Sequence, residues 1–187
     1  IPNIISICEY AFYQCETLTS IEMPNVASIG DYAFYQCKTL TSIDIPNAVT
    51  ELSGFSDCTG LTSILIPNGV TTLAERAFKG CTGLTNIVIP NSVSSIAAGA
   101  FSGCIGLANV VVPDSVTSIA AGAFSGCVGL TNIVISNSIT ELSGFSGCTG
   151  LTNIMIPHSV TRICDGAFSG CTGLTNVVVP DSVTSIA

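Results

Sequence analysis

The chain has 187 residues, of which 48% are apolar and 9% are charged, and its formal net charge is −8. This balance indicates a folded chain with a sizeable core and argues against disorder. The sequence contains no apolar run of the roughly 18 residues that a membrane helix needs and no visible signal peptide, and its four basic residues are too few for the clustered patch that nucleic acid requires.

A unit of 21 to 23 residues recurs along the whole chain. Cysteines at spacings of 22, 21, 23, 23, 23, 21 and 23 residues anchor successive units. Each has a phenylalanine three residues before it, a leucine three residues after it and, except at Ser136, a proline nine residues after it. The anchoring cysteines are Cys15, Cys37, Cys58, Cys81, Cys104, Cys127, Cys148 and Cys171. Such a period predicts a solenoid in which each unit forms one turn.

The first half of each unit, from Cys to Pro, has a fixed length and reads C-x-x-L-x-x-I-x-I-P. Its apolar alternation, as at Ile87 and Ile89, predicts a strand whose two isoleucines lie on one face. The proline that follows ends this strand. Successive units therefore predict a parallel sheet of about eight strands, with neighbouring strands roughly 4.8 Å apart.

The second half of each unit varies in length. It holds another extended piece, V-T-S-I, and then A-F-x-x-C, which is too short for a full helix. Two units are shortened before the phenylalanine, at 49–55 and 139–145. We therefore expect short extended or 3₁₀-like segments on this side of the solenoid. A single unit cannot bury all of its apolar residues, whereas stacked units bury them in one continuous core.

The pattern L-x-x-I-x-I-P-x-x-V-x-x-I-x-x-x-A-F-x-x-C resembles the BspA-like leucine-rich repeat, also called the Treponema pallidum type, over essentially the whole chain. The resemblance implies a β-rich, right-handed leucine-rich-repeat solenoid of the α/β type, with the parallel sheet on its concave face and the short segments on its convex side. It also implies a cell-surface or secreted protein of the adhesin kind. No particular ligand follows, because one fold serves many partners.

We expect residues 1–187 to form a single solenoid domain. The sequence starts partway through one unit and stops partway through another, and neither end carries the polar capping unit that solenoids need for solubility. These features predict a segment of a longer array, or an array whose ends are covered by something else.

The anchoring cysteines lack the C-x-x-C grouping typical of metal sites, and parallel side chains in neighbouring turns have poor geometry for disulfides. We expect them to be buried, reduced and stacked on one another. Cys8 and Cys164 lie outside this column, and we expect both to be at least partly exposed. They either form disulfides with another molecule or with a neighbouring domain, or are tolerated small residues.

The outward residue of each predicted strand is the best candidate for a contact surface. In six strands it is aliphatic, although the solvent face of a strand is usually polar. This aliphatic strip consists of Leu65, Val88, Val111, Val134, Met155 and Val178. Two residues earlier in their strands stand Asn86, Asn109, Asn132 and Asn153. An exposed apolar row with a polar edge predicts a protein-binding site, and the alternative is aliphatic strand propensity in near-identical units.

Few residues suit catalysis or cofactor binding. The only histidine, His158, has no carboxylate or nucleophile at a fixed spacing. Glu22 and Asp44 occupy the strip position in the first two units, where they are more simply a local acidic spot than a pair that holds Ca²⁺. We therefore expect no enzyme activity, no metal site and no cofactor.

The sequence thus predicts a binding module, displayed on a cell surface or secreted, whose concave sheet recognises a host or extracellular-matrix protein. The partner would contact several turns at once, so that its affinity is spread over many weak contacts. The alternative is a structural spacer, or a segment that assembles with copies of itself into a homo-oligomer through the same strip.

Overall fold

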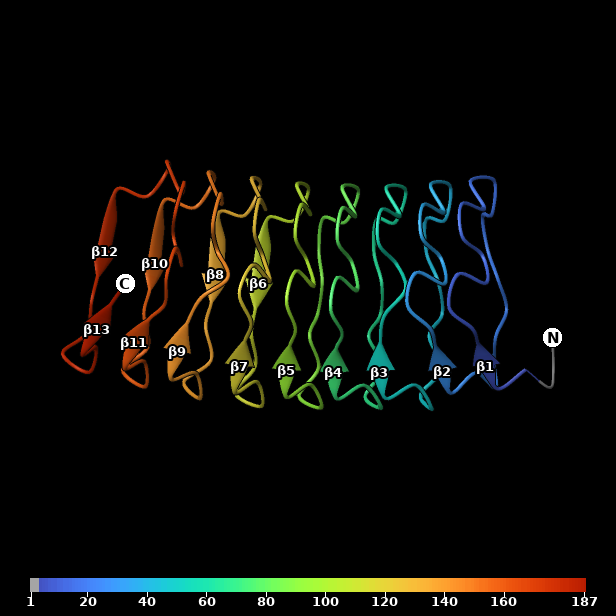
Figure 1. Cartoon of the computed structure of the whole chain (residues 1–187), viewed down its shortest axis with the longest axis horizontal. Helices are drawn as coiled ribbons and strands as arrows, with labels where there is room; N and C mark the ends of the chain where they lie inside the picture. The colour runs from blue at the N-terminus through green and yellow to red at the C-terminus, as the bar shows by residue number, and fades with distance from the viewer. Residues whose placement is uncertain (1–3) are drawn as a thin grey trace.

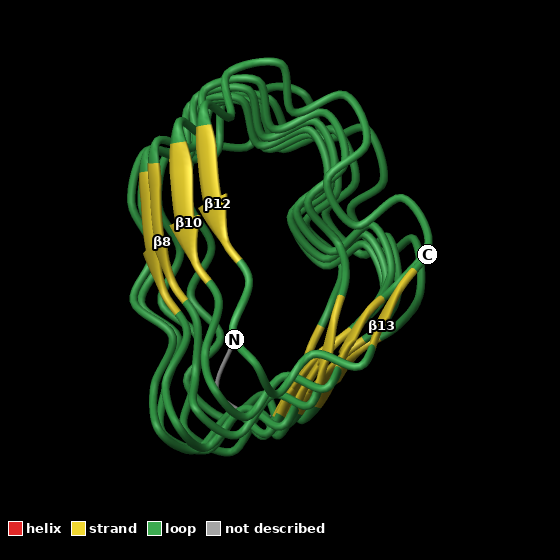
Figure 2. Ribbon diagram, turned by 90° about the vertical axis from the view of Figure 1, so that its left-hand side faces the viewer, coloured by secondary structure: helices red, strands yellow, loops and turns green. Residues whose placement is uncertain are grey.

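The computed structural model describes residues 4–187 and shows a coil of stacked turns, one for each repeat unit (Figure 1). Each turn is an elongated loop in cross-section, with strands on two of its sides (Figure 2). All strand pairs are parallel, so the predicted parallel solenoid is confirmed. Residues 4–187 contain no helix and no 3₁₀ segment, so the α/β label and the predicted 3₁₀-like segments are not seen. The right-handed coil and the concave position of the sheet stay predictions.

The first ladder of strands forms from the C-x-x-L-x-x-I-x-I-P halves. Its regular strands are β6 (Asn109–Val111), β8 (Asn132–Val134), β10 (Asn153–Met155) and β12 (Asn176–Val178). β6 pairs with β8 and β10 pairs with β12, both in parallel and with equivalent repeat positions opposite each other. Earlier units contribute isolated parallel bridges, from Asp44 to Leu65 and from Leu65 to Val88. The predicted parallel pairing is therefore present, but in place of a sheet of about eight strands it consists of two pairs of regular strands in the C-terminal half and of isolated bridges before them.

A second ladder forms from the V-T-S-I pieces, where the sequence predicted extended segments but no sheet. Its strands are β1 (Ser6–Ile7), β2 (Ser28–Ile29), β3 (Glu51–Leu52), β4 (Thr72–Leu73), β5 (Ser95–Ile96), β7 (Ser118–Ile119), β9 (Glu141–Leu142), β11 (Arg162–Ile163) and β13 (Ser185–Ile186). They pair as β1–β2, β3–β4–β5–β7 and β9–β11–β13. Neighbouring turns stack in register, with equivalent repeat positions next to each other. An extended piece of one turn therefore lies beside its equivalent in the next turn and pairs with it.

Tight turns lead from the second ladder back towards the first. The A-F-x-x-C segments close with short-range hydrogen bonds, such as that from the Cys104 amide to the Phe101 carbonyl oxygen at 3.1 Å. Gly103, between them, has a φ of 73°, a left-handed conformation that glycine adopts readily and that stops the turn from continuing as a helix. The turns also bond to each other, since the Phe101 amide donates to the Ala123 carbonyl oxygen at 2.7 Å.

The core consists of columns of identical residues that run along the coil. The phenylalanine rings stack face to face, with ring centroids between 5.2 Å and 5.9 Å apart. Leucine, isoleucine and valine columns pack around them in one cluster. The fully buried rings are Phe34, Phe55, Phe78, Phe101, Phe124 and Phe145. Each ring is covered by the rings of the neighbouring turns, so the core is continuous, as the sequence predicted.

The anchoring cysteines from Cys37 to Cys171 are buried and free, as predicted. They are also hydrogen-bond donors: the Cys104 thiol donates to the Phe78 carbonyl oxygen of the preceding turn at 3.0 Å. This oxygen already accepts the Cys81 amide at 3.1 Å, so the thiol occupies its second lone pair. The same thiol bond recurs along the column. Each cysteine therefore links two turns as well as filling the core.

The two shortened units keep their place in the stack through a serine side chain. In a full-length unit, the amide that follows V-T-S-I donates to the preceding turn, as Ala97 donates to the Leu73 carbonyl oxygen at 2.9 Å. In the shortened units, the buried hydroxyls of Ser53 and Ser143 donate instead, each at 2.8 Å, to the carbonyl oxygens of Ile29 and Ile119. The serine thus gives this buried carbonyl group a hydrogen-bond donor in a unit that is two residues shorter.

Candidate protein-recognition surface

The aliphatic strip lies on the outer face of the first ladder, where its side chains are open to solvent. Its least exposed residue is Val134, at 51%, and its most exposed is Met155, at 83%. The inward residues beside them, such as Ile133 and Ile135, are buried. Val111 lies opposite Val134, and Met155 lies opposite Val178. Figure 1 shows β6, β8, β10 and β12 side by side, so the strip is a row that follows the coil.

The second ladder is the natural comparison for this strip. Its outward residues are Ser6, Ser28, Glu51, Thr72, Ser95, Ser118, Glu141, Arg162 and Ser185, all of them polar. Both ladders are parallel, consist of short strands and come from the same repeat units. Strand propensity acts on both, and it therefore does not explain why only the first ladder carries an outward aliphatic row. The difference favours a contact function for the first ladder.

An asparagine row gives the strip a polar edge. Asn86 bridges to Asn109, and Asn109 lies opposite Asn132, each in parallel register. Asn153 lies opposite Asn176 in the same way. The four predicted asparagines are exposed, so their side-chain amides can donate hydrogen bonds to a partner and accept them. The strip and this row together form a surface with an apolar centre and a polar edge, as protein interfaces have.

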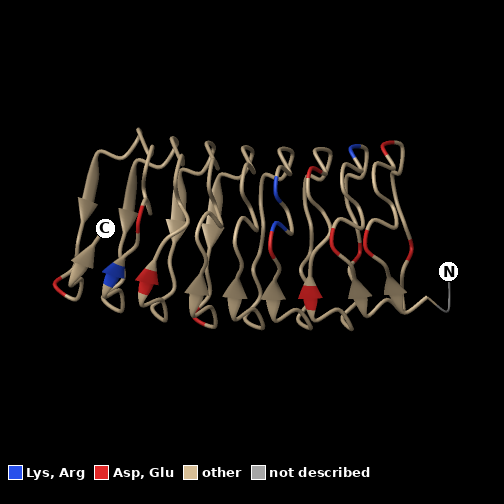
Figure 3. Ribbon diagram, viewed as in Figure 1, with Lys and Arg blue, Asp and Glu red and all other residues tan. Residues whose placement is uncertain are grey.

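Charged residues are absent from the four regular strands of the strip, although Asp44 stands opposite Leu65 at its N-terminal end. Figure 3 shows no charged residue on β6, β8, β10 or β12, whereas the second ladder carries Glu51, Glu141 and Arg162. Between residues 82 and 157 the sequence has only Asp114 and Glu141 as charged residues. Binding at the strip would therefore depend on apolar burial and hydrogen bonds, and would change little with salt concentration.

The other candidate residues do not come together into a chemical site. Glu22 and Asp44 are exposed and lie on a shallow hollow beside Pro24 and Pro46. His158 is exposed in the turn after Pro157. Within residues 4–187, no group of three or more His, Cys, Asp or Glu side chains could hold a metal ion.

The two cysteines outside the column are accessible, as predicted. Cys8 is exposed and Cys164 is half-exposed, and both are free. The Cys164 sulfur lies 4.0 Å from a Glu141 carboxylate oxygen. Disulfide formation between molecules at these two positions stays a prediction.

Comparison with known families and structures identifies the repeat. The family model described as the BspA type leucine rich repeat region, in 6 copies, matches residues 1–107 and 71–187. The two matches overlap and together cover the whole chain. The chain belongs to this family. The resemblance seen in the repeat motif is confirmed, and leucine-rich repeats of this kind are scaffolds for protein interaction.

Three solved bacterial structures resemble this BspA-type chain. A leucine-rich-repeat protein from Bacteroides ovatus is 30% identical over 100% of this chain, with a TM-score of 0.81. The leucine-rich-repeat protein of T. pallidum is 32% identical over 81% of this chain and 74% of its own length, with a TM-score of 0.72. A leucine-rich cell-surface protein from Faecalibacterium prausnitzii is 32% identical over 97% of this chain and 65% of its own, with a TM-score of 0.53.

The BspA-type chain covers only part of these proteins, since it spans 48% of the Bacteroides ovatus chain. None of the curated proteins matches it. Across residues 4–187, no helix has the length and apolar character that crossing a membrane requires.

Proposed function

We propose that this BspA-type chain is a non-catalytic recognition module of a surface-displayed, adhesin-like protein, and that its aliphatic strip binds a host or extracellular-matrix protein. The observation that carries the proposal is the contrast between the two ladders: the outward row is aliphatic on one and polar on the other. The description of the Faecalibacterium prausnitzii relative as a cell-surface protein supports the proposed location.

The proposed mechanism is the burial of several small apolar contacts along the coil. Covering one outward valine or leucine removes apolar surface from water and contributes on the order of 1.5 to 3 kcal/mol. An elongated partner that lies across several turns adds these contributions, and the asparagine row fixes its register by hydrogen bonds. The strip is already held flat and ordered by the ladder beneath it, so little conformational entropy is lost on binding.

Replacing Val111 by glutamate should weaken binding to matrix proteins at least about tenfold, which corresponds to about 1.4 kcal/mol. The introduced carboxylate would lose its water under the partner without gaining an ion pair. The fold should be unchanged, because Val111 is 60% exposed and the same column already accepts Glu22 and Asp44. The measurement is biolayer interferometry against immobilised extracellular-matrix proteins, with circular dichroism as the check on folding.

Val128→Glu is the matched control for this experiment. Val128 is also exposed, at 44%, but it lies in the turn after Cys127, at a position that carries Glu16 in the first unit. This variant should bind like the wild type. If Val111→Glu binds as tightly as Val128→Glu, the strip is not the recognition face.

A further inference from the structure

The four tyrosines of the chain gather on the A-F-x-x-C turns of the first two units, which follow the second ladder in the chain. Tyr10 stacks on Tyr32 with ring centroids 5.5 Å apart, and Tyr13 stacks on Tyr35 at 5.0 Å. The two pairs meet edge to face. Tyr10 and Tyr13 are exposed, and Tyr32 and Tyr35 are half-exposed. Each ring thus has one face covered by its stacked partner, and the cluster as a whole is open to solvent.

A shortened unit opens a hollow beside these rings. The unit at 49–55 has no residue equivalent to Tyr32 or Arg76, which stand on the turns on either side of it. Across this gap the Arg76 guanidinium donates to the Tyr32 hydroxyl at 3.4 Å. Gly54 packs closely against the preceding turn, since a Cβ there would lie only 2.8 Å from the Gly30 carbonyl oxygen.

This gap is a small hollow of about 110 Å³. Next to it lies a larger one, the tyrosine hollow, which has a volume of about 300 Å³ and is lined by the four tyrosines, Ser56, Asp57, Arg76 and Lys79. This volume lies at the lower end of the range for small-ligand sites, about 300 to 1,000 Å³. Its lining is more polar than that of most small-ligand sites, since hydroxyl, carboxylate, guanidinium and ammonium groups stand beside the four rings.

Backbone strain concentrates around the same hollow. The non-glycine residues with positive φ among residues 4–187 are Tyr10, Gln14, Tyr32, Gln36, Asp57 and Arg76, with φ between 54° and 58°. Later turns hold glycine at the equivalent positions, such as Gly99 and Gly103. A left-handed backbone is unfavourable for any residue with a Cβ, and such strain persists mainly where the side chain has a function. The first turns therefore keep side chains that the later turns omit.

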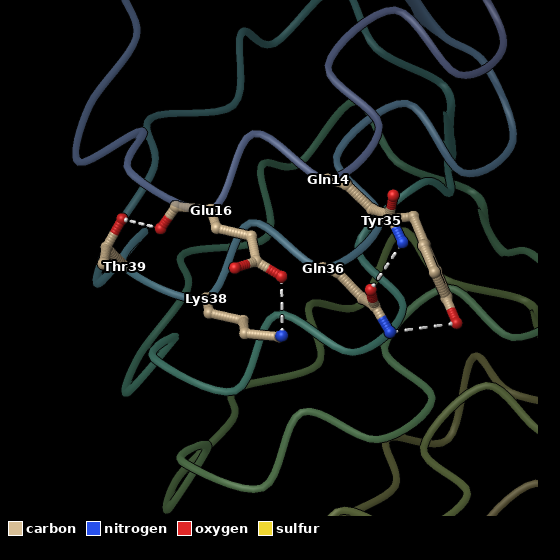
Figure 4. A network of polar contacts seen from close by, with 6 residues as sticks. All are labelled: Gln14, Glu16, Tyr35, Gln36, Lys38 and Thr39. Atoms are coloured by element: carbon tan, nitrogen blue, oxygen red, sulfur yellow. Dashed lines mark hydrogen bonds and ion pairs between the residues drawn. The ribbon is translucent and has the colours of Figure 1, made fainter.

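Hydrogen bonds hold these polar groups in place beside the rings. The Gln14 side-chain amide donates to the Gln36 Oε1 at 3.0 Å, and the Gln36 amide donates to the Tyr35 hydroxyl at 3.3 Å (Figure 4). The Tyr35 hydroxyl also bonds to the Asp57 carboxylate, which raises the pKa of Tyr35. Next to them, Lys38 and Glu16 form an ion pair at 2.7 Å (Figure 4). The donors and acceptors around the hollow are thus ordered before any ligand arrives.

The chemistry of the hollow favours an uncharged ligand. Arg76 pairs with Glu75 at 3.3 Å, and Lys79 lines the hollow together with Asp57, so the positive and negative groups nearly balance. The rings offer apolar faces, and the phenol and amide groups offer both donors and acceptors. A sugar ring has the complementary make-up, with an apolar C–H face and a rim of hydroxyl groups. We propose that the tyrosine hollow binds a neutral saccharide of a glycan, independently of the aliphatic strip.

Tyrosine fluorescence of the whole chain reports on this hollow alone, because all four tyrosines line it and the chain has no tryptophan. We would titrate the wild type with the methyl glycosides of glucose, galactose, mannose and N-acetylglucosamine, and separately with choline as a cationic probe. The expected result is a saturable change with at least one glycoside, at a dissociation constant on the order of 1 mM.

Tyr32→Gly and Arg76→Gly are the decisive variants, because glycine is the natural residue at this position in later turns and tolerates its positive φ. Each should weaken saccharide binding at least tenfold without lowering the melting temperature, whereas Val134→Glu in the aliphatic strip should leave it unchanged. The proposal is overturned if no glycoside gives a saturable response, if both glycine variants bind like the wild type, or if choline binds and the glycosides do not. Loss of matrix-protein binding in Tyr32→Gly without any saccharide response would make the hollow a protein interface and would also overturn it.

Discussion

Replacing Phe101 by alanine should lower the free energy of unfolding by about 3 to 5 kcal/mol, one of the largest effects of any single change in this chain. Phe101 is fully buried, and its ring stacks on Phe78 at 5.5 Å and on Phe124 at 5.2 Å. Alanine would leave a cavity that the neighbouring rings cannot fill, because backbone hydrogen bonds fix the spacing of the turns. Urea denaturation followed by circular dichroism measures the loss.

Two control variants separate the cavity from the mere loss of a side chain. Phe101→Leu keeps most of the buried volume and should cost clearly less than Phe101→Ala. Val128→Ala removes an exposed side chain and should change the stability by no more than about 0.5 kcal/mol. A urea midpoint for Phe101→Ala that matches the wild type would show that the phenylalanine column does not hold the turns together.

Raising the pH above about 9 should destabilise the fold steeply, because the buried thiols cannot ionise in place. Burial raises the pKa of Cys58, Cys104 and Cys148 to about 12, and thiols in the unfolded chain ionise near pH 8.5, as model peptides do. Above that pH the folded state holds more protons than the unfolded state. The free energy of unfolding therefore falls as the pH rises from about 8.5 to about 12, by up to about 1.4 kcal/mol per thiol and pH unit.

Cys104→Ser is the matched variant for this pH effect. A serine hydroxyl can still donate to the Phe78 carbonyl oxygen, but it does not ionise in this range. The decline in stability between pH 9 and pH 11, measured by urea denaturation, should be shallower than in the wild type by up to about 1.4 kcal/mol per pH unit. All other groups are the same in the two proteins, so their contributions cancel in the comparison. An unchanged decline would mean that the Cys104 thiol is not held neutral by the fold.

The features that depend on spacing alone were predictable from the sequence. The fixed distances from Phe101 to Cys104 and from Cys104 to Leu107 place these residues on the same inner face in every turn, and all three are buried. The alternation around Val111 likewise predicted that this residue points outward, and the structure confirms that it does. A repeat makes such predictions robust, because each position is tested again in every unit.

The features that depend on what lies in the neighbouring turn were not predictable in this way. The V-T-S-I pieces pair because neighbouring turns stack in register. This stacking cannot be seen in the sequence of a single unit. The role of Ser53 requires knowing that a shortened unit leaves the Ile29 carbonyl without a backbone donor. The tyrosine hollow was also missed; its signal was that Tyr32 and Arg76 stand where later units have glycine, on either side of a shortened unit.

The aliphatic strip connects the fold to the proposed function, because within residues 4–187 its outward side chains are aliphatic, whereas those of the second ladder are polar. If it serves a foreign partner, it must be open on the free protein. If it serves self-assembly, copies of the chain must cover it. These two situations differ in the mass of the particle in solution.

Light scattering on the wild type and on the double variant Val111→Glu, Val134→Glu is therefore the most direct test. We expect both to be monomers at the chain mass of 19.1 kDa, even at high concentration. A wild-type oligomer that the double variant dissociates would contradict this expectation and assign the strip to self-association.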